Sequence, residues 1–324
     1  MLIDSLLIIS GLILLVKGGD WLVDGATGLA RHYKISELVI GLTIVAFGTS
    51  APELVVSAVA SVGGHSEIAF ANVIGSNNLN LFIILGITGL IAPLTIRKST
   101  IRREIPISLF AAMVLYLLAN WGFASDDGNL LSRLDGVILL ILLATFVYYV
   151  FKSMKNGEKN SEITEEKTVQ KAYHPGRLAL FIFLGLTGLI VGGRLVVDSA
   201  VDLARTLNIS EKIIGLTIIA VGTSLPELVT SITAIRKKSS DIAIGNVIGS
   251  NIFNIFLILG VSSLCRPMEY SSLFNMDIYL LCLGTLLLLL FMFTGRKRVL
   301  ERWEAAIFVV VYVAYVSYLM ILPA

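Results

Sequence analysis

Two glutamates stand out because each lies within an apolar stretch long enough to cross a membrane. Glu53 and Glu227 both follow the sequence Gly-Thr-Ser-x-Pro. A charge near the middle of a bilayer costs about 2.5–3.5 kcal/mol on insertion scales, so it persists where it faces a partner or a cavity. The alternative is an ion pair with Lys17 or Arg194, the two basic residues inside apolar stretches. Neither base has a counterpart in the other half of the chain, where Val191 and Asp20 stand instead, so the two cannot serve both glutamates equivalently. This favours glutamates that bind a ligand.

The motif before each glutamate supplies further oxygen atoms. Proline lacks the N–H that would bond the carbonyl four residues earlier, which frees the carbonyls of Gly48 and Gly222. Thr49 and Thr223 precede the glutamates by four residues and therefore share a helix face with them. The alternative is a kink used only for packing. A kink that occurs twice, each time with a glutamate, favours a binding role.

A second polar pattern follows on the next apolar stretch in each half of the chain. Its residues are spaced by four: Asn72, Ser76 and Asn80, and again Asn246, Ser250 and Asn254, with Asn77 and Asn251 beside them. Side chains at this spacing share a helix face. The alternative role is polar contact between helices, worth about 0.6 kcal/mol each. That role stays open for the first asparagine of each pattern and the flanking asparagines, whereas the remaining serines and asparagines are favoured as ligands.

The combined donors are carboxylate, hydroxyl, amide and carbonyl oxygens, without histidine or cysteine. Such a set suits a hard cation, Ca²⁺ or Na⁺, rather than Zn²⁺ or Cu⁺. Two negative charges balance one divalent ion, and Na⁺ is close to Ca²⁺ in size, so one site could hold either in turn. The two cysteines, Cys265 and Cys282, make no metal-binding pattern.

These residues belong to an internal repeat. Residues 41–86 and 215–260 align at an offset of 174 with 28 identities in 46 positions. The identities include Thr, Ser, Pro, Glu, Asn and Gly, which chance similarity between apolar helices does not explain. The two copies begin an odd number of spans apart, so they cross the membrane in opposite directions. Inverted repeats with broken helices are typical of secondary transporters, with the substrate near the midplane.

The elements that must position these residues are membrane spans. The chain has 324 residues, of which 56% are hydrophobic and 15% charged, and its mean hydropathy is +0.86. These values exclude a disordered chain, a disulfide scaffold and an ordinary soluble enzyme. Apolar runs of about twenty residues match about 30 Å of hydrocarbon. They predict spans at 2–30, 37–62, 68–92, 104–122, 133–151, 177–205, 212–235, 241–264, 274–294 and 302–321.

The sequence therefore predicts an all-α polytopic membrane protein with ten transmembrane helices in two inverted-topology five-helix repeats, residues 1–151 and 177–324. Of the 25 lysines and arginines, 19 fall in one alternating set of loops, and basic loops face the cytoplasm. We therefore expect both termini outside and the hydrophilic segment 152–176 to be a flexible cytoplasmic linker. The first residues lack a basic region, so we expect no cleavable signal peptide.

On these motifs the chain resembles the cation/calcium exchanger superfamily, and within it the prokaryotic sodium/calcium exchangers. The resemblance rests on residues 48–53 with 75–80 and on residues 222–227 with 249–254, and it covers essentially the whole chain. It implies that spans two, three, seven and eight form the ion-binding core, and that spans one and six slide to gate access. It also implies electrogenic exchange of Na⁺ for Ca²⁺ by alternating access.

The resemblance further implies which residues bind metal ions. Glu53 and Glu227 would be the central carboxylates shared by Ca²⁺ and Na⁺. The other implied oxygen donors are Thr49, Ser50, Thr223, Ser224, Ala46, Ala220, Ser76, Ser250, Asn80 and Asn254. The expected partners are the two transported ions and the lipid bilayer of a prokaryotic inner membrane. We expect no catalytic activity, no cofactor, no nucleic acid and no obligate protein partner.

Several alternatives remain open from the sequence. Some relatives, including the potassium-dependent branch, place an aspartate where this chain has Asn254, so the neutral Asn80 and Asn254 disfavour potassium coupling. The acidic helix that marks proton/calcium exchangers is missing, which disfavours proton coupling. The inverted motifs speak against a passive cation channel, and the lack of a Ser/Lys dyad or metal motif speaks against an intramembrane hydrolase.

Two further carboxylates recur at the same offset in spans one and six. Asp24 and Asp198 could attract ions at the two mouths of a pathway. The equally favoured alternative is local charge pairing, since Arg194 precedes Asp198 by four residues.

Overall fold

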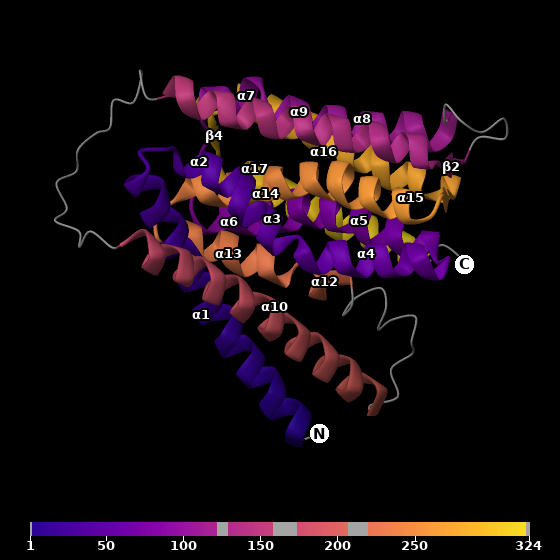
Figure 1. Ribbon diagram of the computed structural model, residues 1–324, viewed down its shortest axis with the longest axis horizontal. Coiled ribbons are helices and arrows are strands. Elements are labelled where there is room, and N and C mark those ends of the chain that lie inside the picture. The colour runs from indigo at the N-terminus through magenta and orange to yellow at the C-terminus, as the bar shows by residue number, and fades with distance from the viewer. Residues whose placement is uncertain (1, 122–128, 158–173, 207–219, 322–324) are drawn as a thin grey trace.

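The computed structural model describes residues 2–121, 129–157, 174–206 and 220–321, which fold almost entirely as helix (Figure 1). Within these ranges, eight continuous helical stretches are long and apolar enough to cross a bilayer, and one bent pair adds a ninth. The prediction of a helical polytopic membrane protein is thus confirmed. The predicted span 212–235 is described only from residue 220 onward, and its first part lies outside the described residues.

The first half of the chain contains five predicted spans. Its elements are α1 (Leu2–His32), α2 (Glu37–Ile40), η1 (Gly41–Val45), α3 (Ala46–Thr49), α4 (Ala51–Gly63), α5 (Ser66–Asn78), η2 (Leu79–Ile84), α6 (Leu85–Ile91), β1 (Leu94–Thr95), α7 (Lys98–Arg102), α8 (Glu104–Trp121), β2 (Leu130–Leu131) and α9 (Arg133–Gly157). The second span is therefore built from four short helical pieces, and the third from three.

The second half repeats this order where it is described. Its elements are α10 (Pro175–Thr206), α12 (Ala220–Gly222), α13 (Leu225–Arg236), α14 (Ser240–Phe253), η4 (Asn254–Leu259), α15 (Gly260–Cys265), β3 (Met268–Glu269), η5 (Ser272–Phe274), α16 (Asn275–Phe291), β4 (Val299–Leu300) and α17 (Arg302–Ile321). The segments η1, η2 and η4 are π-helical, a local widening of the helix that is frequent at functional sites.

The predicted linker 152–176 is shorter at both ends than the hydropathy indicated. Helix α9 continues to Gly157 and helix α10 begins at Pro175, while residues 158–173 lie outside the described part of the chain. Lysine is a good helix former, and its long side chain can reach the membrane surface from a helix end. Hydropathy marks where the apolar region ends, and the backbone helix runs on past it.

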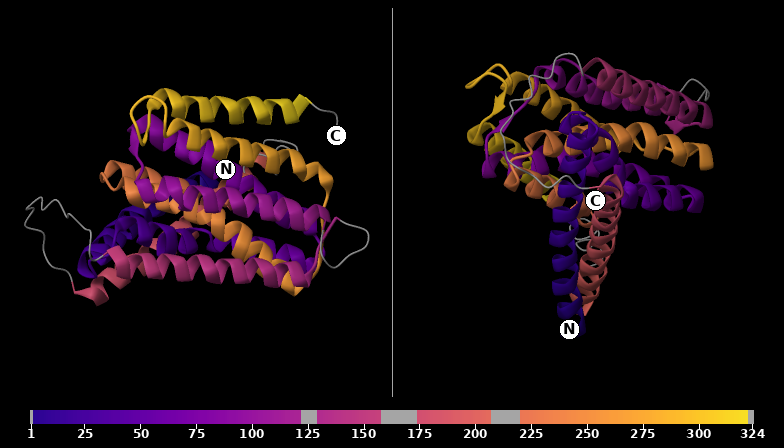
Figure 2. Two further views of the ribbon diagram at one scale, coloured as in Figure 1. Left: turned by 90° about the horizontal axis from the view of Figure 1, so that it is seen from above. Right: turned by 60° about the vertical axis from the view of Figure 1, so that its left-hand side comes forward.

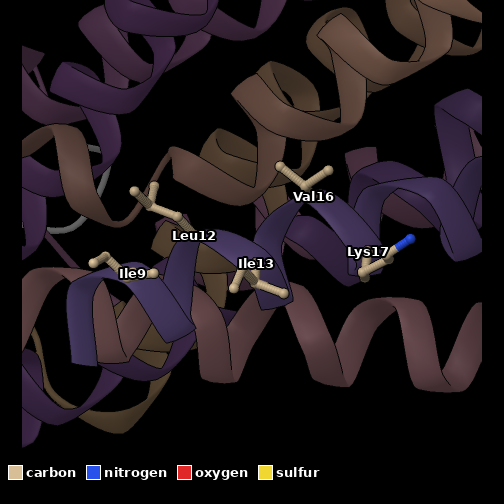
Figure 3. A pocket seen from close by; sticks show the side chains of 5 residues that line it. All are labelled: Ile9, Leu12, Ile13, Val16 and Lys17. Atoms are coloured by element: carbon tan, nitrogen blue, oxygen red, sulfur yellow. The ribbon is translucent and has the colours of Figure 1, made fainter. Parts of the chain in front are cut away.

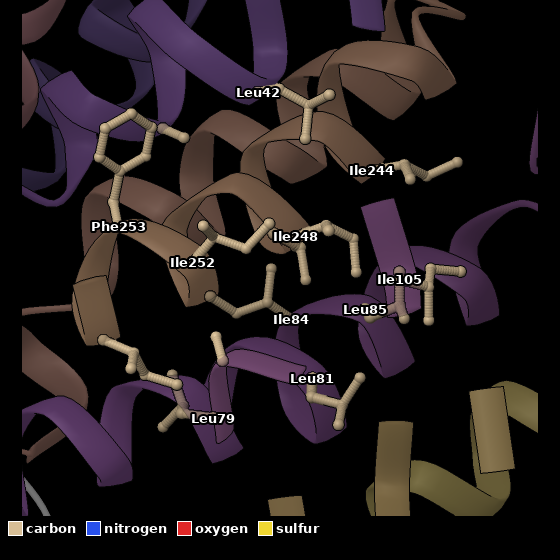
Figure 4. Packing of buried hydrophobic residues seen from close by; sticks show 14 of the residues in the cluster. Leu42, Leu79, Leu81, Ile84, Leu85, Ile105, Ile244, Ile248, Ile252 and Phe253 are labelled. Atoms are coloured by element: carbon tan, nitrogen blue, oxygen red, sulfur yellow. The ribbon is translucent and has the colours of Figure 1, made fainter. Parts of the chain in front are cut away.

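Two spans form the centre of the bundle. In Ser240–Cys265, 94% of the most apolar window is buried, and in Ser66–Ile91 72% is buried, against 17–44% in the other continuous spans. Figure 4 shows side chains of both central spans in one apolar cluster, among them Leu81, Ile84, Ile248 and Ile252. The remaining helices therefore surround a core built from the two stretches that carry the polar pattern.

Helices α1 and α10 lie side by side and project away from the rest of the bundle (Figure 1 and Figure 2). Glycines at seven-residue intervals line their contact: Gly11, Gly18 and Gly25 on α1, and Gly185 and Gly192 on α10. A Cβ added at Gly18 would lie 2.8 Å from the carbonyl oxygen of Gly185. Small residues let membrane helices approach backbone to backbone, so these glycines make the α1–α10 contact possible.

Two short antiparallel ladders join the halves of the chain. β1 pairs with β4 through Leu94 and Leu300, and β2 pairs with β3 through Leu131 and Met268. Strands β1 and β3 occupy equivalent positions in the two copies, at the offset of 174. The partner of β1 is β4 and the partner of β3 is β2, and Figure 1 shows β4 and β2 at opposite ends of the bundle. Opposite ends for equivalent strands are consistent with two copies that run in opposite directions.

Candidate cation-binding site

Each glutamate of the repeated motif lies in the first turn of a helix that follows a break in its span. Ser50 separates α3 from α4 with φ −80° and ψ 6°, and Ser224 precedes α13 with φ −90° and ψ 8°. The first of these breaks bends the span by 46°. Proline is tolerated in the first turn because its missing N–H is not needed there. The predicted kink is thus confirmed, and Glu53 and Glu227 are both buried.

The serines of the motif contact the glutamate of the opposite copy. The Ser50 hydroxyl donates to Glu227 Oε1 at 3.1 Å, and the Ser224 hydroxyl lies 3.4 Å from Glu53 Oε1. Ser224 also lies 3.2 Å from the hydroxyl of Ser76. The two breaks therefore face each other, and the carboxylates belong to one site rather than two.

Neither basic residue inside the spans pairs with these carboxylates. None of the ion pairs among the described residues includes Glu53 or Glu227. Lys17 is exposed on α1, on the same outer face as Ile9, Ile13 and the other apolar side chains in Figure 3. The interpretation of the glutamates as partners of a buried base is therefore wrong for this structure.

An asparagine on the neighbouring helix holds the backbone of each glutamate. The side-chain amide of Asn72 donates to the carbonyl oxygen of Glu53 at 3.3 Å, and that of Asn246 donates to the carbonyl oxygen of Glu227 at 3.3 Å. The same amide nitrogens reach the hydroxyls of Ser57 at 2.9 Å and Ser231 at 3.0 Å. These contacts fix the position of the glutamate backbone against the central helices.

The threonines of the motif donate to the same asparagines across the repeat. Thr49 Oγ1 lies 3.0 Å from Asn246 Oδ1, and Thr223 Oγ1 lies 3.4 Å from Asn72 Oδ1. Since a hydroxyl has two lone pairs besides its proton, each threonine oxygen can still accept a cation contact. Each motif threonine was predicted to share a helix face with its glutamate. It also contacts an asparagine of the other half of the molecule.

Two further asparagines lie in the π-helical turns at the middle of the central helices. Asn80 is in η2 and Asn254 is in η4, and both are buried. The amide nitrogen of Asn80 donates to Asn251 Oδ1 at 3.0 Å, and that of Asn254 donates to Asn77 Oδ1 at 3.0 Å. The predicted polar stripe is thus brought to the contact between the two central spans.

These contacts occur in reciprocal pairs. Four kinds of contact, from serine to glutamate, asparagine to glutamate, threonine to asparagine and asparagine to asparagine, occur in both copies at the offset of 174, whereas the contact of Ser224 with Ser76 occurs once among the described residues. A two-fold relation between the halves produces this pattern. The site therefore lies on the boundary between the repeats and draws equally on both.

Five oxygen atoms of the predicted ligand residues are buried without a hydrogen bond to any described residue. They are the Ser250 hydroxyl, Glu53 Oε2, Glu227 Oε2, Asn80 Oδ1 and Asn254 Oδ1, all with side chains that are at most 1% exposed. A buried polar atom without a partner costs about 1–3 kcal/mol, and more when it is charged. Two carboxylate and two amide oxygens left in this way form a donor set for a hard cation.

A cavity of about 670 Å³ adjoins the site. It is lined by Pro52, Gly222, Thr223 and Pro226 beside the two breaks, and by a face of α10 that includes Arg194 and Asp198. The cavity therefore reaches the two glutamate motifs from the half of α10 nearer its C-terminus. An ion could approach the site along this face.

The two recurring aspartates differ in their partners. Lys237, just after α13, lies 2.9 Å from Asp24 Oδ1 and 3.2 Å from Asp20 Oδ1. Among the described residues, the ion pair expected between Arg194 and Asp198 is not formed. Asp24 is thus paired, as the alternative supposed, but its partner is not local: Lys237 comes from the other half of the chain and has Gly63 as its repeat equivalent.

The remaining predicted residues lie around the same centre. Ser250 is buried on α14, and the Ala46 carbonyl already accepts from Ser50 N at 3.0 Å. Ala220 begins α12, and its side chain lies outside the described part of the chain. The sequence reasoning missed Ser57 and Ser231. Their equivalence at the offset of 174 was the signal that could have found them.

The sequence and the fold are both similar to those of known proteins. The chain matches the family described as "Sodium/calcium exchanger protein" over residues 4–152 and 177–321. It is 40% identical over 277 residues to "Inner membrane protein YrbG" of Escherichia coli (strain K12), covering 84% of this chain and 83% of that protein. It is 33% identical over 343 residues to "Sodium/calcium exchanger MaX1" of Methanosarcina acetivorans, covering 97% of each.

The fold is similar to a solved structure of the sodium-calcium exchanger NCX_Mj soaked with 10 mM Na⁺ and zero Ca²⁺. The TM-score is 0.82 at 35% sequence identity, with 98% of this chain and 99% of that chain covered. The family match and the structural match each include both halves of the repeat, so the similarity extends to the elements that contribute to the site.

Proposed function

Since the chain belongs to the sodium/calcium exchanger protein family, we propose that it is a secondary active antiporter that exchanges Na⁺ for Ca²⁺ by alternating access. The observation that carries this proposal is the set of four buried carboxylate and amide oxygens without hydrogen bonds, two from each copy of the repeat. Two carboxylates balance the charge of one Ca²⁺ or of two Na⁺ ions. Occupancy of one site by either ion, but not by both, couples their movements.

The ion ligands in this proposal are the residues predicted from the sequence. Glu53 and Glu227 supply the charge, and Asn80 and Asn254 supply neutral oxygens at the centre. The remaining oxygens come from Thr49, Ser50, Ser76, Thr223, Ser224 and Ser250 and from the carbonyls of Ala46 and Ala220. The reciprocal hydrogen bonds support this assignment, because they hold the two glutamates, the two motif serines and the two central asparagines at one boundary between the repeats.

Alternating access is supported by the difference between the two ends of the site. The cavity beside α10 adjoins the breaks from one end. Beyond the other end of α13, Lys237 ties this helix to Asp20 and Asp24 of α1. An inverted repeat can exchange the roles of its two ends, because each half can adopt the conformation of the other.

The proposed orientation follows the basic residues. The loops that contain Arg97, Lys237 and Arg296 belong to the strongly basic set, which places them and the linker on the cytoplasmic side with both termini outside. The cavity beside α10 then opens outward. Cysteines introduced in the linker and near the C-terminus, labelled from one side with an impermeant maleimide, test this orientation.

Transport itself is tested by ⁴⁵Ca²⁺ uptake into proteoliposomes loaded with Na⁺, with K⁺ or with a proton gradient. We expect calcium uptake only when an outward Na⁺ gradient drives it. The resemblance implies that more Na⁺ charge moves than Ca²⁺ charge, and such electrogenic exchange predicts that an imposed membrane potential changes the rate of uptake, whereas exchange of two Na⁺ for one Ca²⁺ predicts no change. Glu53→Gln and Glu227→Gln each remove one negative charge, so that one positive charge of the bound Ca²⁺ is left without a partner. This costs about 3–5 kcal/mol of binding free energy and lowers the calcium affinity more than a hundredfold.

Glu104→Gln is the matched control. Glu104 is also a buried glutamate within a span, but its carboxylate accepts from Tyr149 in the α8–α9 contact, away from the site. Uptake should survive this substitution. Uptake driven equally by K⁺ or by protons, or uptake that survives both substitutions in the motif, would contradict the proposal.

A further inference from the structure

The two ends of an asparagine side chain are chemically opposite toward a cation. The oxygen of the amide binds a positive ion, whereas its NH₂ group carries two hydrogens that repel one. Asn80 and Asn254 are among the proposed ligands, and the amide oxygen of each is buried without a hydrogen bond. Each contributes to ion binding only if its oxygen, rather than its nitrogen, faces the ion. Something in the structure must therefore set the orientation of the two amides.

The amide nitrogens of both residues are held by a second pair of asparagines. Asn80 donates to Asn251 Oδ1, and Asn254 donates to Asn77 Oδ1, each at 3.0 Å. Because these acceptors have no hydrogen to donate from that oxygen, a reversed amide at position 80 or 254 would place oxygen against oxygen. The contact therefore leaves the oxygens of Asn80 and Asn254 as the ends that face away from it, and both are buried without a hydrogen bond.

Asn77 and Asn251 are themselves fixed by each other. The amide of Asn77 donates to the carbonyl oxygen of Asn251 at 3.3 Å, and the amide of Asn251 donates to the carbonyl oxygen of Asn77 at 3.3 Å. Both side chains are at most 1% exposed. Their nitrogens are directed to backbone carbonyls, so their oxygens are the ends left for Asn80 and Asn254. We refer to this closed set of four asparagines as the amide clasp.

We propose that Asn77 and Asn251 are positioning residues, which set the calcium affinity by holding the oxygens of Asn80 and Asn254 toward the ion. This inference rests on the proposed function, because it assumes that the centre of the site binds Ca²⁺. Asn77 and Asn251 do not themselves contact the ion. They act through the orientation of their neighbours.

A purely structural role makes a different prediction. The amide clasp joins α5 and α14, and a polar contact between membrane helices stabilises by about 0.6 kcal/mol. Loss of such contacts would lower the melting temperature and the amount of active protein while the KM for calcium stays the same. Loss of orientation would raise the KM, because a reversed amide removes one oxygen ligand from the ion.

The neighbouring Asn78 provides a matched control. It is buried on the same helix as Asn77, but its amide donates to the carbonyl oxygen of Asp277 on α16 at 3.0 Å. Its equivalent in the second copy is Ile252, so an amide at this position is not part of the reciprocal network. Asn78→Ile removes a buried amide next to the amide clasp without changing any of its contacts.

The experiment measures the initial rate of ⁴⁵Ca²⁺ uptake into Na⁺-loaded proteoliposomes as a function of calcium concentration. Asn251→Leu frees the Asn80 amide, and we expect the KM to rise on the order of tenfold, the value of one oxygen contact to a charge. The maximal rate per folded protein should change less than the KM. Asn78→Ile should leave the KM within about twofold of the wild-type value, because substitutions at sites that do not interact usually alter one another's free energies by no more than about 0.3–0.5 kcal/mol.

A double-mutant cycle isolates the orientation effect. In an Asn80→Asp background both ends of the side chain are oxygen, so orientation no longer matters and Asn251→Leu should not raise the KM. The mirror cycle, Asn77→Leu with Asn254→Asp, tests the same idea independently if one set of variants fails to fold. Melting temperatures of all variants in detergent report folding separately from affinity.

The possible results separate the two proposals. If an outward Na⁺ gradient drives no calcium uptake by the wild-type protein, the proposed function fails, and the positioning role of the amide clasp fails with it. If the wild-type protein exchanges normally but Asn251→Leu and Asn77→Leu lower only stability, the positioning role is refuted. It is also refuted if Asn251→Leu raises the KM equally with Asn80 and with Asp at position 80.

Discussion

The contact between α1 and α10 depends on glycine at positions where a side chain would meet backbone atoms. Gly192 faces α1, and a Cβ built there would lie 2.8 Å from the carbonyl oxygen of Gly11 and 2.9 Å from the nitrogen of Leu15. Gly193, the next residue, faces α13 instead. Its nearest described atoms are Pro226 Cγ at 3.8 Å and Cδ at 3.9 Å, which is ordinary van der Waals contact.

These distances predict opposite outcomes for two adjacent substitutions. Gly192→Ala requires the two helices to separate by several tenths of an ångström, because backbone atoms cannot rotate aside, and such overpacking costs about 1–3 kcal/mol. Alanine favours a helix over glycine by about 1 kcal/mol, and this gain applies to both positions. Gly193→Ala should therefore be neutral or stabilising, and the two variants should differ by about 1–3 kcal/mol.

The assay compares the two variants in detergent by thermal denaturation, with the folded fraction measured by size-exclusion chromatography. Sodium-driven ⁴⁵Ca²⁺ uptake by the same preparations reports function. We expect Gly192→Ala to melt at a lower temperature and to exchange more slowly, since α10, which the substitution displaces, lines the cavity beside the site. Equal stability and equal uptake for the two variants would refute the reasoning, because the helix-propensity term is common to both.

Three further outcomes are expected. Lys237→Gln removes the ion pairs to α1 and should destabilise by about 1 kcal/mol or less in thermal denaturation, since the partners are half-exposed; a larger loss would contradict a surface ion pair. Tyr315→Phe removes the hydroxyl that donates to the half-buried carboxylate of Asp277 and should cost about 1–3 kcal/mol, whereas Tyr318→Phe, at a 51% exposed side chain, should cost nothing measurable. Calcium at about 100 times its Kd should stabilise the wild-type protein by about 2.7 kcal/mol, and a similar melting shift in Glu227→Gln would argue against binding at this site.

Much of the fold could be predicted because a membrane span requires a continuous run of apolar residues, which is visible in the sequence. Eight of the predicted spans appear as continuous helical stretches, and the bend in the second was expected from Pro52. The π-helical turns at Asn80 and Asn254 and the short ladders of β1 to β4 were not predicted. These features depend on how helices from different parts of the chain pack against one another. Hydropathy and proline spacing contain no information about such contacts.

The candidate site was predictable as a set of residues but not as a geometry. Repetition at the offset of 174 identified Glu53, Glu227 and their neighbouring oxygens, because two copies of a polar motif in apolar helices need a common explanation. The repeat could not indicate that Ser50 contacts Glu227 rather than the glutamate three residues away from it. Nor could it indicate that Lys237, with no equivalent base in the first half, pairs with Asp24.

The sequence by itself determined that this is a helical membrane protein with two copies of an acidic, oxygen-rich motif, because apolar length and motif identity are local properties of the chain. The tertiary structure decided which atoms meet. It pairs each serine with the opposite glutamate and directs the amide of Asn80 to Asn251, a residue 171 positions away. The physical reason is that a hydrogen bond is fixed by distance and angle, and these follow from how the two halves pack together.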